Sequence, residues 1–266
     1  MTDSRARLIY GLHAVKTVLE RRPESIVAAW LHERATGKRL AGIEAVLEAL
    51  GIKVNRAARS ALDRQSGGGA HQGVVIEVRA GEEFTVRELE AMVVERGRSL
   101  RLLVLDRVED PRNLGACLRT ADACGIDAVI VPQSRAARVT PAARKAATGA
   151  AETVPVHRAA NLARTLAWLK AAGVWIVGAD GTADRSLYES ELRTPLAVVV
   201  GGEGRGLRRL TRKSCDELVA IPMHGMVASL NVSVACGVVL YELLRRCPVD
   251  GRPGTEPPAS GSPRGA

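Results

Sequence analysis

The stretch Leu196-Ala-Val-Val-Val200, followed by Gly201-Gly-Glu-Gly-Arg-Gly-Leu207, decides the fold of this chain of 266 residues. Five consecutive apolar residues are typical of a strand that is buried on both faces, as in a parallel sheet. The glycines that follow let the backbone approach a ligand closely. The two segments together predict a parallel α/β sheet with a binding loop where this strand ends.

A second stretch, Asn113-Leu-Gly-Ala-Cys-Leu-Arg119, follows the strand-like run Leu102–Asp106 and a polar turn. We predict that Asn113 lies at the N-terminus of a helix, where its side chain can cap the helix. Arg119 lies six residues further on, which is nearly two helical turns. We therefore expect both side chains to border one cleft.

A third stretch contains a short strand at residues 218–221, a loop at 222–228 and the segment Ser229-Leu-Asn231. Ser229 and Asn231 open a helix that is apolar almost throughout. Such a helix has too few polar residues for a face exposed to solvent, so it should be buried in the core or at a subunit interface.

Alternating strands and helices in the second half predict a mostly parallel sheet that is covered on both faces. We divide the chain into residues 1–79, a linker at 80–99, a second domain at 100–246, and a tail at 247–266 that is rich in proline and glycine and expected to be disordered. The strands of the second domain are expected near residues 102–106, 127–131, 153–156, 174–179, 196–200 and 218–221.

The first 79 residues predict a small α/β domain that carries much of the positive charge. It holds 13 Lys and Arg against 8 Asp and Glu, so its net charge is 13 − 8 = +5. His71 follows a flexible glycine run and either contacts a ligand or has only a structural role. The expected elements are helices near Leu12–Arg22 and Lys38–Leu50, strands near Ile26–His32 and Val74–Val78, and a linker helix within Val86–Val94.

The net charge of +9 suggests a polyanionic partner, although a merely soluble basic protein is an equal alternative. Aromatic residues are 3% of the chain, which argues against binding single strands by base stacking and favours structured RNA. The five cysteines are odd in number and form no Cys-x-x-Cys pair, so we expect neither disulfides nor a metal site. No segment is apolar for long enough to predict a membrane span, and we expect a cytoplasmic protein.

Each polar candidate also has a plainer interpretation. The loop Gly201–Gly206 could be an ordinary turn, and it lacks the Gly-Lys-Ser/Thr ending of a nucleotide-triphosphate loop. Arg119 could be a solvated cation, whereas Asn113 and Glu203 could serve only as caps or local partners. None of these residues identifies a function alone.

Taken together, the three stretches resemble those of the S-adenosylmethionine-dependent 2'-O-ribose RNA methyltransferases of the SpoU/TrmH family, within the SPOUT superfamily. The resemblance covers nearly the whole chain, and the polar positions of the three motifs all match. It implies a C-terminal trefoil knot, a ribosomal-protein-like RNA-binding domain at the N-terminus, and a homodimer. It implies active-site residues Asn113, Arg119, Glu203, Ser229 and Asn231, and cofactor contacts from Gly201, Ile221, Met223 and Leu230.

The segments Ile9-Tyr-Gly-Leu-His-Ala-Val15 and His71-Gln-Gly73 further resemble the subgroup that methylates a guanosine of large-subunit (23S) ribosomal RNA. A tRNA ribose methyltransferase and a noncatalytic RNA-binding ribosome assembly factor are the alternatives. The extra N-terminal domain argues against the first alternative, and the intact polar motif positions argue against the second.

Overall fold

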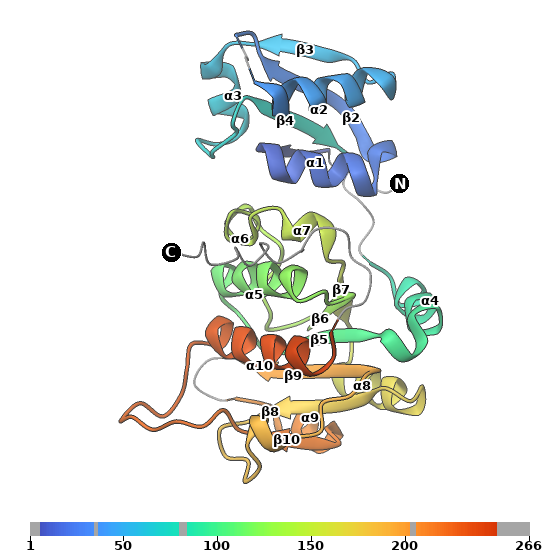
Figure 1. Cartoon of the computed structure of the whole chain (residues 1–266), viewed down its shortest axis with the longest axis vertical. Coiled ribbons are helices and arrows are strands. Elements are labelled where there is room, and N and C mark those ends of the chain that lie inside the picture. Colours follow the sequence, from blue (N-terminus) through green and yellow to red (C-terminus); the bar gives the residue numbers. More distant parts are fainter. Residues whose placement is uncertain (1–5, 35–36, 80–83, 203–205, 249–266) are drawn as a thin grey trace, which may run out of the picture.

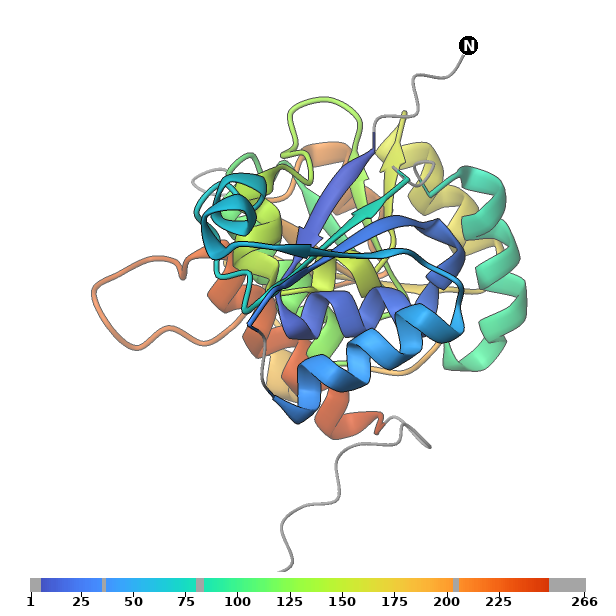
Figure 2. The same cartoon turned by 90° about the horizontal axis from the view of Figure 1, so that it is seen from above.

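The computed structural model describes residues 6–34, 37–79, 84–202 and 206–248. These residues form two sheets, one in each half of the chain, stacked along the long axis of the molecule (Figures 1 and 2). The greater part of the expected tail, residues 249–266, lies outside the described residues, as do residues 80–83 of the expected linker.

The first sheet has four strands in the order β1-β4-β2-β3. Its central strand β4 pairs antiparallel with β1 and β2, and β2 pairs parallel with β3. The expected helices and strands are confirmed, whereas β1, β3 and α3 were not expected from the sequence. The elements are β1 (Arg7–Tyr10), α1 (Leu12–Arg21), η1 (Pro23–Ser25), β2 (Ile26–His32), α2 (Lys38–Ala49), β3 (Val54–Ala57), α3 (Arg59–Gln65) and β4 (Val74–Val78).

The second sheet has six strands in the order β10-β8-β9-β5-β6-β7, and all its neighbouring strands are parallel. This confirms the expected parallel sheet. Its elements are α4 (Val86–Arg96), η2 (Gly97–Ser99), β5 (Arg101–Asp106), α5 (Pro111–Ala123), β6 (Ala128–Pro132), α6 (Pro141–Ala147), α7 (Ala150–Thr153), β7 (Val156–Ala159), α8 (Leu162–Ala171), β8 (Trp175–Ala179), η3 (Leu187–Glu189), β9 (Leu196–Gly201), α9 (Arg209–Ser214), β10 (Glu217–Val219) and α10 (Val232–Arg246).

The strand expected at residues 153–156 was placed too early. Residues 150–153 form the short helix α7, and β7 begins at Val156. Pro155 precedes the strand, and proline cannot donate a ladder hydrogen bond. Thr148 and Gly149, at φ +51° and +97°, end α6 and start α7. The left-handed turn at these two residues is what a search for apolar runs alone misses.

Alternate side chains of the central strands fill two separate cores. Leu103 and Leu105 pack with α5 and α10 on one face of the sheet, whereas Leu102 and Val104 pack with α4 and α8 on the other. Since every residue of β5 is buried, the continuous apolar pattern is explained by a sheet covered on both faces.

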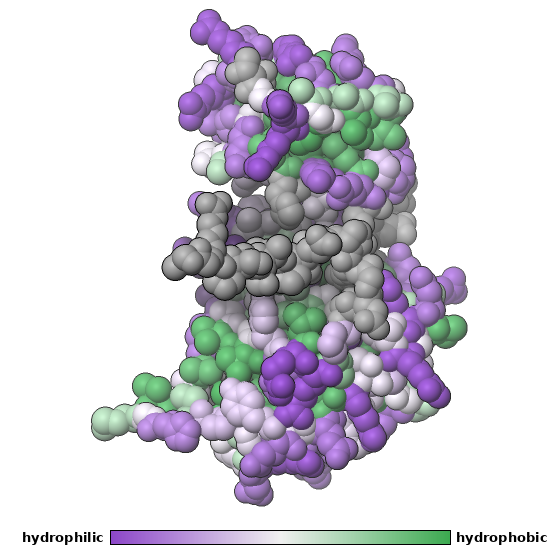
Figure 3. Space-filling model, viewed as in Figure 1, coloured by the Kyte–Doolittle hydropathy of each residue, from purple (hydrophilic) through white to green (hydrophobic). Residues whose placement is uncertain are grey.

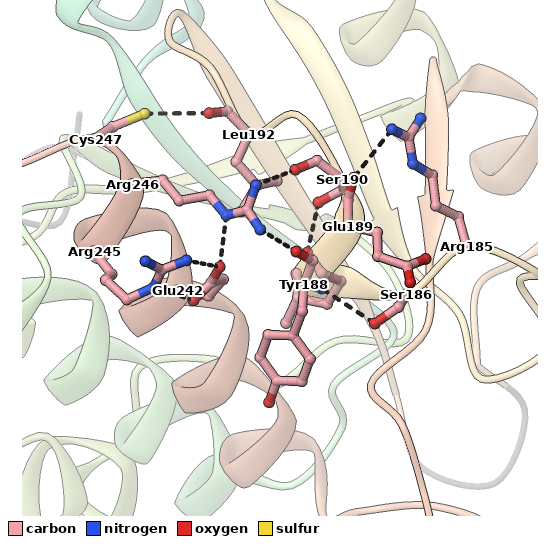
Figure 4. Close-up of polar contacts among 11 residues, drawn as sticks. Arg185, Ser186, Tyr188, Glu189, Ser190, Leu192, Glu242, Arg245, Arg246 and Cys247 are labelled. Carbon is pink, nitrogen blue, oxygen red and sulfur yellow. Dashed lines mark hydrogen bonds and ion pairs between the residues drawn. The ribbon is translucent and has the colours of Figure 1, made fainter.

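The end of α10 is tied to the loop between β8 and β9 (Figure 4). Arg246 donates to the carbonyl oxygens of Tyr188 and Ser190, and the Cys247 thiol donates to that of Leu192. Glu242 accepts from Arg245 and Arg246, and the hydrogen bonding from Arg245 is the main cause that lowers its pKa to about 2. The end of the last helix is thus attached to a loop that precedes it by 55 to 58 residues.

Candidate active site

Two asparagines from distant parts of the chain meet at the start of α10. Asn231 Nδ2 donates to Asn113 Oδ1 at 3.3 Å, which joins α10 to α5. Asn231 is also the N-cap of α10, because its Oδ1 accepts from the Ser233 backbone N–H at 2.9 Å. The first and third sequence stretches are therefore in contact, as one shared site requires.

The expected cap of α5 was wrong in detail. The helix begins at Pro111, and Asp110 is the N-cap, with its Oδ1 accepting from the Arg112 backbone N–H at 2.8 Å. Proline is favoured at the first helical position because that position needs no N–H donor. Asn113 therefore lies inside the first turn, where its half-buried side chain is available to Asn231.

The glycine loop is held by a residue that the motifs did not single out. Asp106, the last residue of β5, is fully buried. Its carboxylate accepts from the Arg208 backbone N–H at 3.0 Å and from Arg208 Nε at 2.6 Å, while its carbonyl oxygen accepts from the Gly202 N–H at 2.8 Å. Asp106 thereby holds Gly202 and Arg208, which lie on either side of the loop, in place. The signal in the sequence was an acidic residue at the end of a buried apolar strand.

Glycine at positions 201 and 202 is required by the packing of the backbone itself. A Cβ at Gly201 would lie 2.3 Å from the carbonyl carbon of Gly206, and one at Gly202 would lie 2.0 Å from the carbonyl oxygen of Arg107. Gly206 has a φ of +57°, and it pairs with Gly202 in an isolated bridge. The close approach expected of these glycines is therefore present within the loop; whether a ligand also uses it stays a prediction.

Two of the remaining catalytic candidates are exposed, and the third lies outside the described residues. Arg119 is exposed on α5 and makes no hydrogen bond or ion pair with any residue that the structure describes. Ser229 is also exposed, just before the cap of α10. Glu203 lies outside the described residues. The structure thus brings Asn113 and Asn231 into contact, and the catalytic roles of all five residues stay predictions.

The four cofactor candidates lie at the ends of β9 and β10 and just before α10. Gly201, Ile221, Met223 and Leu230 are all half-buried. Between Met223 and Leu230 the chain is exposed, and this segment extends from the body of the molecule as the orange loop in Figure 1. The apolar side chains of this set leave part of their surface uncovered.

The described residues offer little support for thiol chemistry or metal binding. Burial raises the pKa of the Cys215 thiol to about 12 and that of Cys124 to about 11, and a hydrogen bond with Cys117 is the main cause that raises the pKa of Cys236. These thiols stay protonated at neutral pH and are poor nucleophiles. Over the same residues, no group of three His, Cys, Asp or Glu side chains could hold a metal, and no helix is long and apolar enough to cross a membrane.

His71 has a structural environment in the first domain. It is buried, its Nε2 lies 3.1 Å from Asp63 Oδ1, and its Nδ1 accepts from the Gly73 N–H at 3.0 Å. Both ring nitrogens are therefore used within the domain. This favours the structural alternative for His71 over direct contact with a ligand.

Comparison with protein families places these features in one class. Residues 101–241 match the SpoU rRNA Methylase family, and residues 8–84 match the domain described as RNA 2'-O ribose methyltransferase substrate binding. The chain belongs to the SpoU rRNA methylase family.

Curated relatives match over almost their whole length. The chain is 50% identical over 241 residues to the 23S rRNA (guanosine-2'-O-)-methyltransferase RlmB of Yersinia pestis, covering 91% of this chain and 98% of that protein. It is 46% identical to the protein of the same name from Escherichia coli K12, covering 91% and 99%.

Solved structures share the fold. The SpoU methyltransferase AviRb from Streptomyces viridochromogenes, in complex with AdoMet, has a TM-score of 0.74 at 24% identity, covering 91% of this chain and 90% of that one. The A. aeolicus TrmH/SpoU tRNA modifying enzyme has a TM-score of 0.52 at 28% identity, covering 60% and 82%. The match to the tRNA modifying enzyme is therefore much less extensive.

Proposed function

We propose that this protein transfers a methyl group from S-adenosylmethionine to the 2'-hydroxyl of a guanosine ribose in 23S ribosomal RNA. The observation that carries the proposal is the Asn113–Asn231 hydrogen bond, which brings the first and third motifs of a methyltransferase family into contact. Relatives named for this reaction are 46–50% identical over 91% of the chain, which supports the choice of substrate.

The residues of the candidate cofactor site suit S-adenosylmethionine. Ile221, Met223 and Leu230 are half-buried apolar side chains, as packing around an adenine ring requires. Gly201 has no side chain, so it can offer a ligand only its backbone groups. When bound, this cofactor supplies a methyl group on a sulfonium, so the protein has to align the acceptor hydroxyl and help it lose a proton.

Arg119 is our candidate for stabilising the reacting oxygen. A guanidinium has a pKa above about 12, so it is a poor base, but its planar fork can hold a phosphate and a developing alkoxide together. Its exposure on α5 leaves it accessible to an RNA substrate. Asn113 and Asn231, fixed to each other, would orient the ribose, with Ser229 and Glu203 completing the site.

We propose that the first domain binds the RNA. It contains a cavity of about 690 Å³ between α1 and α2, and Lys16, Lys38 and Arg39 are among its lining residues. Gln72 also lines it and accepts from the Leu12 N–H at 3.1 Å, which ties together two segments quoted above for their resemblance. Phosphate contacts of this kind position an RNA without reading its sequence.

Two alternatives remain to be compared with this function. For a tRNA substrate, the tRNA modifying structure matches over only 60% of this chain, whereas relatives named for ribosomal RNA match over 91%. For a noncatalytic assembly factor, the relatives that match over 91% of this chain are instead named as methyltransferases.

One experiment separates these functions. Ribose methylation is mapped across ribosomal RNA and tRNA from a strain lacking the gene and from the complemented strain. We expect the loss of one methylated guanosine in 23S ribosomal RNA. Loss of a tRNA methylation instead would identify the first alternative, and no change in any methylation would favour the assembly factor.

A truncation tests the division of labour between the domains. The fragment 100–246 should retain affinity for S-adenosylmethionine, measured by calorimetry in excess chelator, and lose most RNA affinity and methylation. If the fragment methylates ribosomal RNA as well as the full chain does, the first domain is not the substrate-recognition module.

We further propose that the protein is a homodimer through α10 and the loop before it. Val234 and Tyr241 on α10 are 51% and 56% exposed, and Met226 and Val227 in the loop are also exposed. Figure 3 shows hydrophobic atoms over this helix and along the protruding loop. Sedimentation equilibrium should give a dimer for the native chain and a monomer for Tyr241→Glu. A native monomer would exclude this interface.

A trefoil knot is also proposed for the catalytic half. It is supported by the return of α10 from the sheet edge at β10 to pack beside α5 and by its attachment to the loop at residues 188–192. An experimental electron-density trace through residues 201–231 tests it. Because the proposed substrate is ribosomal RNA, we place the protein in the cytoplasm.

A further inference from the structure

One buried carboxylate connects the two domains. Glu152 of α7 has a side chain that is only 4% exposed, and it accepts from three arginines. Its Oε2 faces Arg7 of β1 and Arg22 at the end of α1, both in the first domain. Its Oε1 faces Arg144 of α6, in the catalytic domain. Oε2 thus binds the first domain, and Oε1 binds the catalytic domain.

The cluster is well removed from water. The three arginine side chains are 25%, 25% and 26% exposed. Burial is the main cause that lowers the pKa of Arg7 to about 10, at which it remains protonated at neutral pH. Three positive charges share one negative charge, so the loss of Glu152 would leave like charges facing each other across the domain junction.

The same elements lead to the candidate active site. The left-handed residues Thr148 and Gly149 turn the chain between α6 and α7 and so place Glu152 against the first domain. Helix α6 packs closely on α5: a Cβ at Gly115 would lie 2.2 Å from the carbonyl oxygen of Ala143. Gly115 lies between Asn113 and Arg119 in the sequence of α5. Figure 1 shows α1 directly above α6 and α7, with α5 below them.

We propose that Glu152 is a positioning residue: it fixes the RNA-binding domain on the α6–α5 helix pair, so that bound RNA reaches Asn113 and Arg119 in one register. The proposal rests on the methyltransferase function proposed above. In-line methyl transfer needs close alignment, and a misplacement of about 1 Å can reduce a rate about a hundredfold.

The test compares Glu152→Gln with Glu242→Gln. Both carboxylates are nearly buried and paired with arginines, but the partners of Glu242 are all within the catalytic domain. With RNA saturating, Glu152→Gln should lower the single-turnover rate at least tenfold, while affinities for RNA and S-adenosylmethionine change less than twofold. Small-angle scattering should show a larger radius of gyration. Glu242→Gln should change neither the rate at saturating RNA nor the radius.

Arg22→Gln provides a second variant should Glu152→Gln fail to fold. If the two residues act through one contact, the double variant should lose no more rate than Glu152→Gln alone. A normal single-turnover rate, additive losses, or the same loss in Glu242→Gln would overturn the positioning role. Lack of methylation by the native protein would instead refute the proposed function, and the scattering comparison would still test the domain contact.

Discussion

Replacing Asp106 with asparagine tests whether the buried carboxylate holds the glycine loop in place. The change keeps the shape of the side chain and removes its charge. Asp106 is fully buried, and it accepts two hydrogen bonds from Arg208, at 2.6 and 3.0 Å. An asparagine has one acceptor oxygen there, and its amide group would place a donor against a donor.

The expected loss follows from these contacts. Hydrogen bonds to charged groups contribute about 1.5–3 kcal/mol each, and removal of one partner of a buried pair costs about 3–5 kcal/mol. Because the Arg208 side chain is 39% exposed and can keep water, we expect the lower end, about 3 kcal/mol in the free energy of unfolding. Affinity for S-adenosylmethionine should fall about tenfold or more, because the loop loses its anchor to β5.

A matched control is available at the other end of the neighbouring strands, immediately before β6. Asp127 is nearly buried and accepts from the Arg101 backbone N–H at 2.9 Å, and its other oxygen pairs with Arg96 at 3.1 Å. Urea unfolding should show a comparable loss for Asp127→Asn, whereas calorimetry should show unchanged cofactor affinity. If Asp106→Asn unfolds and binds as the native protein does, or if both variants lose affinity equally, Asp106 is not the anchor of the loop.

Three further changes test other parts of the site. Arg119→Lys should lower turnover about a hundredfold without changing cofactor affinity. The control Arg112→Lys on the same helix should change neither turnover nor cofactor affinity. Equal effects of the two substitutions on turnover would make Arg119 a generic cation. Gly115→Ala should lower the free energy of unfolding by about 1–3 kcal/mol in urea, because the new Cβ would lie 2.2 Å from a carbonyl of α6, while Gly237→Ala, with 4.0 Å of room, should show no such loss. Glu242 has a folded-state pKa of about 2 against an ordinary 4.5, so it contributes stability above about pH 4.5 that disappears as the pH falls towards 2; Glu242→Gln should flatten that decline in acid titrations followed by circular dichroism.

The parallel sheet was predictable because its strands are continuous apolar runs. Leu196–Gly201 has five fully buried residues, and such a run between loops has few other interpretations. Shorter strands with mixed polarity, such as Arg7–Tyr10 and Val54–Ala57, have no equivalent signal. They are stabilised as strands by pairing with β4 and β2, which is a contact between distant residues.

Only part of the contact between Asn113 and Asn231 was predictable from the sequence. Asn231 was placed correctly because a cap immediately precedes an apolar helix, which is a local signal. Asn113 was mistaken for the cap, whereas Asp110, followed by Pro111, provides a stronger cap three residues earlier. Local sequence rules can rank the candidates for a helix cap. They do not show that Asn113, which is not the cap, contacts Asn231 at the start of α10.

Asp106 and Glu152 show what local patterns do not contain. Each is an ordinary acidic residue in sequence, and each acquires its role from arginines far along the chain: Arg208 lies 102 residues from Asp106, and Arg7 lies 145 residues from Glu152. The cost of burying a charge ensures that such residues have partners, but it does not say which of the 38 Lys and Arg residues they are. The fold determines which arginines pair with each carboxylate. It brings Arg208 to Asp106 where the glycine loop meets the sheet, and it brings Arg7 to Glu152 where the two domains meet.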